Sequence, residues 1–166
     1  MKIVLVILVV ISSSVVGKNI QLKYKNKVNI YKNLIKFADF TILKIQSFND
    51  GLDNIFDEYI SNCDNKLVSD YFIIKSIIFS SRKLEYDDMK KLKICQNLKG
   101  NEINDIMNFI NLLGKNDIKS QLSSIKGYRE IFKNKLYDAE KDLKQNGDLI
   151  YKVSICAGVA LSILLL

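Results

Sequence analysis

The side chains that could do acid, base or nucleophile chemistry in this chain are carboxylates, cysteines, tyrosines and lysines, because none of the 166 residues is a histidine. The lack of imidazole excludes Ser-His-Asp triads, Cys-His pairs and histidine-ligated zinc. Adjacent acids occur at Asp57-Glu58 and Asp87-Asp88. On a helix, however, neighbouring side chains diverge by about 100°, so these acids do not face each other across a cleft.

Asp53 and Asp57 lie four residues apart and would share one helix face. They could bind a cation, or they could form a solvated acidic face that answers Lys36 and Lys44. The solvated face is the preferred interpretation. With no metal-ligand spacing and no glycine-rich phosphate loop, we expect no catalysis, no metal site and no cofactor.

The three cysteines are Cys63, Cys95 and Cys156. Cys156 lies inside an apolar C-terminal segment, which leaves Cys63 and Cys95 as an even pair. In an oxidising compartment such a pair predicts one disulfide bond, Cys63 to Cys95. Two free buried thiols are the alternative.

Both ends of the chain are apolar. After Lys2, the uncharged run of residues 3–11 and the small residues before Gly17 predict a secretory signal peptide over residues 1–17. The last fourteen residues, 153–166, carry no charge and as a helix would extend about 21 Å, short of a bilayer crossing.

Such a tail at the end of a chain predicts a glycosylphosphatidylinositol (GPI) attachment signal, with lipid attached at Asn146 or Gly147. Its spacer is shorter than usual, and a retained short membrane anchor or a buried core helix are the alternatives.

Charge is distributed unevenly within a net formal charge of +7. Residues 18–48 hold seven lysines against the single acid Asp39, and residues 49–64 hold five acids and no base. Since nearly all the bases are lysine, nucleic acid is not the expected partner. Lys23, Lys25 and Lys27 are the candidate contacts for an anionic lipid surface or an acidic glycan.

Apolar residues recur at helical spacing through the middle of the chain. From Tyr24 to Ile45 they alternate at four-three spacing, which predicts one long helix, although a strand is possible before residue 28. Further helical patterns cover residues 52–60, 66–80, 87–98, 101–113 and 117–145. In the last of these Arg129 falls in a core register, where it either snorkels or meets a buried acid such as Asp39.

We therefore predict an all-α fold, an up-down bundle of about five helices over residues 18–147, between the signal peptide and a hydrophobic tail over residues 148–166. The layout resembles that of small GPI-anchored surface antigens. It predicts a cell-surface interaction protein in the secretory pathway, anchored on the outer side of the membrane, with a protein receptor as a further possible partner. A secreted carrier of lipid or another small hydrophobic ligand is the alternative.

Overall fold

Helices form every regular element in this computed structural model, which describes residues 2–48, 50–62, 67–80, 82, 84–113 and 118–165. The elements are α1 (Lys2–Phe48), α2 (Leu52–Ser61), α3 (Val68–Phe79), α4 (Tyr86–Lys91), the 3-10 turn η1 (Lys93–Cys95), α5 (Gly100–Leu112), α6 (Ile118–Asp142), the π-helical turn η2 (Leu143–Gly147) and α7 (Asp148–Leu165). The described part of the chain is about 90% helical and contains no strand, which confirms the all-α fold class.

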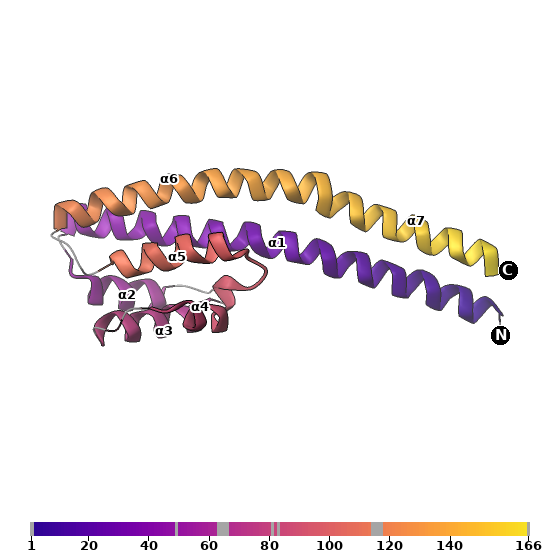
Figure 1. Cartoon of the computed structure of the whole chain (residues 1–166), viewed down its shortest axis with the longest axis horizontal. Helices are drawn as coiled ribbons and strands as arrows, with labels where there is room; N and C mark the ends of the chain where they lie inside the picture. Colours follow the sequence, from indigo (N-terminus) through magenta and orange to yellow (C-terminus); the bar gives the residue numbers. More distant parts are fainter. Residues whose placement is uncertain are drawn as a thin grey trace. The chain divides into compact units, whose positions relative to one another are not determined.

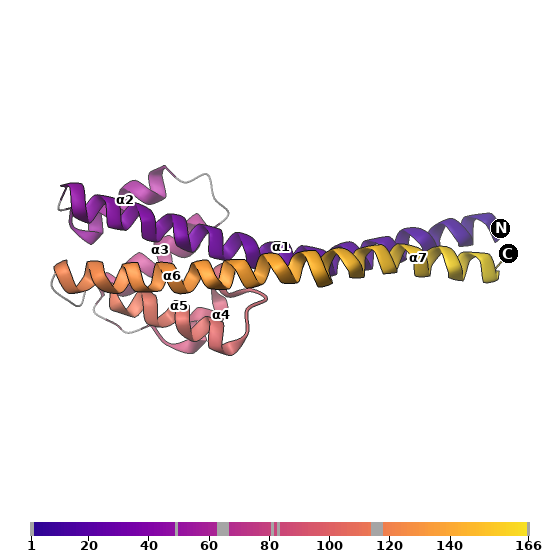
Figure 2. The same ribbon diagram turned by 90° about the horizontal axis from the view of Figure 1, so that it is seen from above.

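The chain divides into two compact units (Figure 1). The terminal unit comprises Met1–Asn29 and Lys135–Leu166, and the central unit comprises Ile30–Asn134. This division differs from the predicted boundaries, because the two apolar ends of the chain fold together in one unit. In two perpendicular views α7 runs beside the N-terminal part of α1, and the two chain ends meet at the same end of the terminal unit (Figure 1 and Figure 2).

Helix α1 is continuous from Lys2 to Phe48, so the segment that could have been a strand is helical. No proline or turn sequence interrupts residues 2–48, and apolar side chains occur along all of them. The predicted signal peptide thus forms the first turns of the same helix that contributes to the central unit.

An aromatic cluster forms the core of the central unit. Phe37 of α1 lies at its centre, with its ring centroid 5.1 Å from Phe56, 5.0 Å from Tyr59 and 5.0 Å from Tyr71. Phe109 of α5 extends the cluster to Phe132 of α6, at 5.2 Å. Offset and edge-on ring contacts of this kind are favoured by the ring quadrupoles, so α1, α2, α3, α5 and α6 share one core.

Two buried acids connect helices of the central unit. Asp70 of α3 accepts a hydrogen bond from the Ile94 backbone N–H at 2.7 Å, and Glu102 of α5 accepts one from the Tyr31 hydroxyl at 2.9 Å. The predicted helix over residues 87–98 is present only as far as Lys91, because Leu92 is extended and separates α4 from η1. The Asp70 bond to Ile94 holds η1 against α3 and gives that break its physical reason.

The ion pair suggested by the sequence is present: Arg129 of α6 contacts Asp39 of α1 through its Nε and the Asp39 carboxylate. Both side chains are partly exposed, so the pair lies at the edge of the core rather than inside it. The predicted partner is therefore correct, but the acid is exposed and not buried as predicted.

Candidate functional site

Small residues line the contact between α1 and α7 in the terminal unit. A methyl group at Gly17 would lie 2.6 Å from the Ser154 Cβ, and one at Gly158 would lie 2.9 Å from the Ser13 Cβ. The Ser13 hydroxyl donates to the Ser154 carbonyl oxygen across the same contact. We call these four residues the small-residue seam. Such seams let two helix backbones approach closely, as in helix pairs within membranes.

The surface of the terminal unit that faces away from the seam is apolar. Its exposed side chains are Val4, Ile7, Leu8, Ile11, Val15 and Val16 on α1, and Leu149, Val153, Val159, Leu161, Ile163 and Leu164 on α7. Buried Ser162 belongs to the inner side of α7, at 5% exposure. A water-soluble helix pair would show the opposite arrangement, with apolar residues inside and polar residues outside.

Serine hydroxyls of the terminal unit bond to backbone carbonyl groups of the unit itself. Ser12 donates to Val9, Ser14 to Val10, Ser154 to Ile150 and Ser162 to Gly158, at 2.8–3.0 Å. A hydroxyl in hydrocarbon has no water to bond, so internal partners of this kind remove the cost of placing it there.

The two helices change from apolar to charged at the same level. Because Gly17 packs against Ser154 and against the Tyr151 backbone, Lys18 and Lys152 lie near one another along the unit's length. Beyond them, the Gln21 amide donates to Asp148 at 2.7 Å. The uncharged stretches, residues 3–17 and 153–166, each extend about 21–23 Å.

The π-helical turn η2 joins α6 to α7 where lipid attachment was predicted. Gly147 is buried, and a methyl group there would lie 3.3 Å from the Tyr24 ring and 3.0 Å from Leu143, whereas Asn146 is exposed. The two residues thus form part of a continuous helical connection. Single π-turns often occur where a helix must adjust its packing, and here Gly147 lets Tyr24 approach.

The three lysines predicted to contact an anionic surface lie on α1, beyond Lys18. Lys23 and Lys25 are exposed, and Lys27 is half-buried. The structure thus presents two of the three to solvent, within the terminal unit and next to its apolar part.

The predicted acidic face of α2 is bound by lysines. Lys75 of α3 contacts Asp53 at 2.7 Å and Asp57 at 2.5 Å, and Lys44 contacts Glu58 at 2.5 Å. The predicted partners of Asp53 and Asp57 were Lys36 and Lys44, whereas the structure pairs both acids with Lys75 and pairs Lys44 with Glu58. Across the described residues, no group of three His, Cys, Asp or Glu side chains could hold a metal ion.

Cys95 is buried and free, which corrects the expectation of a disulfide-bonded protein, while Cys63 lies outside the described residues. Burial, with the nearby Asp70 carboxylate, raises the pKa of Cys95 to about 12. Since the thiolate is the reactive form, this thiol is protonated and inert at neutral pH.

One helical stretch in the described part of the chain, Lys119–Leu164, is long and apolar enough to cross a membrane by length and composition. Only 17% of the apolar stretch in this helix is buried, which disfavours the core-helix alternative for the C-terminal tail. Fold and surface together define a class: an all-helical protein with a helix able to anchor in a membrane.

The chain belongs to the family of Stage III sporulation protein AB, because the family model matches residues 2–166. This is a family of bacterial sporulation membrane proteins. No curated protein and no solved structure matches the chain.

The family overturns the predicted function and localisation. The chain is neither a secreted or cell-surface, antigen-like interaction protein nor a secreted carrier of a hydrophobic ligand, and its expected place is at a membrane rather than in a secretory pathway. The signal peptide and the GPI attachment signal are corrected with it. The physical reason is that both apolar ends, read separately as sorting signals, pack on each other along the small-residue seam.

Proposed function

We propose that the two packed helices of the terminal unit, here called the hairpin, insert into the membrane and anchor the central unit there. The central unit would then act as a non-catalytic interaction module for sporulation. The observation that carries the proposal is the inverted polarity of the unit. Its seam consists of glycine and serine, and its outer surface consists of leucine, isoleucine and valine. In water that arrangement leaves a large apolar area exposed, whereas in a membrane the hydrocarbon would cover it.

The common polar boundary supports insertion of both helices to the same depth. Tyr151, whose backbone packs against Gly17, lies at this boundary, and Tyr24 packs against Gly147 further from the apolar part. Tyrosine is enriched at membrane interfaces. The apolar length of about 21–23 Å is shorter than a hydrocarbon core of about 30 Å. Snorkelling of Lys18 and Lys152 and local thinning of the bilayer would make up the difference.

Lysines on one side of the boundary support an orientation. Exposed lysines occur on both helical segments at the end of the terminal unit that continues into the central unit. They are Lys18, Lys23 and Lys25 of α1, Lys144 of η2 and Lys152 of α7. Lysine-rich flanks stay in the cytoplasm. We therefore propose that the central unit is cytoplasmic and that Lys23 and Lys25, with Lys27 behind them, contact anionic phospholipid headgroups.

The test is extraction of membranes from cells that express the full chain. Alkaline carbonate should leave the protein in the pellet. Leu8→Arg and Leu161→Arg, on the outer apolar surface, should move it toward the soluble fraction or cause its degradation. Leu43→Arg is the matched control, because Leu43 is exposed to a similar degree in the central unit and should keep the membrane fraction. A wild-type chain released by carbonate would refute the proposal.

A further inference from the structure

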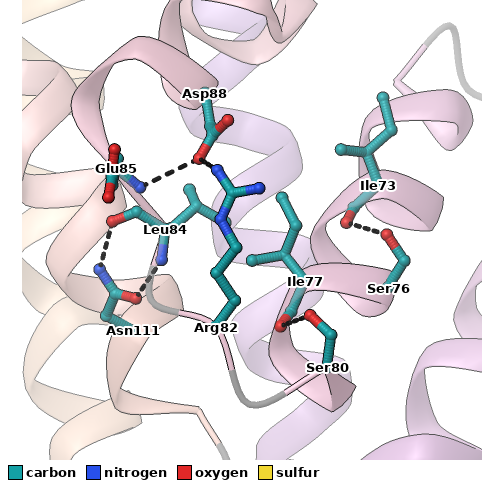
Figure 3. Close-up of polar contacts among 9 residues, drawn as sticks. All are labelled: Ile73, Ser76, Ile77, Ser80, Arg82, Leu84, Glu85, Asp88 and Asn111. Atoms are coloured by element: carbon teal, nitrogen blue, oxygen red, sulfur yellow. Dashed lines mark hydrogen bonds and ion pairs between the residues drawn. The ribbon is translucent and has the colours of Figure 1, made fainter.

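We draw no further inference here: the strongest candidate, the apolar stripe that α3 exposes in the central unit at Phe72, Ile73 and Phe79, where Ser76 bonds back to the Ile73 carbonyl (Figure 3), carries none because nothing in the structure shows what covers it.

Discussion

Gly17 of α1 packs against Ser154 of α7 so closely that a methyl group on the glycine would lie 2.6 Å from the Ser154 Cβ. Residues 137 positions apart thereby bring the two apolar ends of the chain into one helical hairpin. The relationship explains why neither end can be interpreted alone. Each end alone is an apolar segment shorter than a bilayer crossing, with no sign of its partner. Packed together, the two ends form a unit whose polar groups face inward and whose apolar groups face outward.

Enlarging the seam should separate the hairpin helices. We expect Gly17→Val or Gly158→Val to destabilise the terminal unit by about 1–3 kcal/mol, because neither Ser154 nor Ser13 can move without shifting its helix. Gly127→Ala is the control: no atom lies within 4 Å of the added methyl group, so it should raise helix stability by about 0.5–1 kcal/mol. Denaturant unfolding of the full chain in micelles, followed by circular dichroism, measures all three. If Gly17→Val did not lower the free energy of unfolding, the close contact between Gly17 and Ser154 would be contradicted.

Removing lysines next to the boundary should weaken contact with anionic lipid. In nanodiscs that mix neutral and anionic phospholipids, Lys23→Gln with Lys25→Gln should lower the preference for anionic lipid about fivefold per lysine at low salt. Native mass spectrometry of the lipids that stay bound reports the preference. Lys91→Gln with Lys126→Gln removes the same charge from the central unit and should have little effect. A wild-type preference that persists in high salt would speak against headgroup contact.

Asp70 should make the central unit less stable as pH rises. Burial raises the pKa of this carboxyl, so the folded chain holds its proton to a higher pH than the unfolded chain does. Its contribution is fully present below the pKa of an unfolded aspartate, about 4, and is lost as pH rises through the folded value. Asp70→Asn should remove that part of the pH dependence while keeping an acceptor for Ile94. Urea unfolding from pH 3 to 8 compares the variant with the wild type, and parallel curves would exclude the effect.

Tyr31→Phe should cost about 1–3 kcal/mol of unfolding free energy, because it leaves the buried Glu102 carboxylate without its hydroxyl donor. Glu102 also accepts from the Lys99 backbone N–H at 2.9 Å, so the start of α5 should remain helical. Tyr137→Phe, on an exposed tyrosine, is the control and should be neutral. Hydrogen exchange should show faster opening of the contact between α1 and α5. Unchanged exchange in Tyr31→Phe would mean that the bond contributes nothing.

The sequence was sufficient for the helical fold and for particular contacts within it. Four-three spacing predicted the long helix through Tyr31 and Ala38, both buried, and the core register of Arg129 led to its partner Asp39. Local patterns could not show that residues 3–17 and 153–166 pair, because the pairing depends on contacts between opposite ends of the chain. One signal was present but not used: Ser154, Gly158 and Ser162 recur every four residues, as small residues do along a helix contact in membranes.

The most direct test of the account asks what surrounds the outer surface of the terminal unit. A spin label on Cys156, which is exposed on α7, can be compared in liposomes with one at Lys126→Cys on exposed α6, each as the single cysteine. The account predicts that oxygen, which dissolves in hydrocarbon, reaches the Cys156 label, while a water-soluble nickel chelate reaches only the Lys126→Cys label. Equal access of the nickel chelate to both positions would place the outer surface in water and contradict insertion of the hairpin.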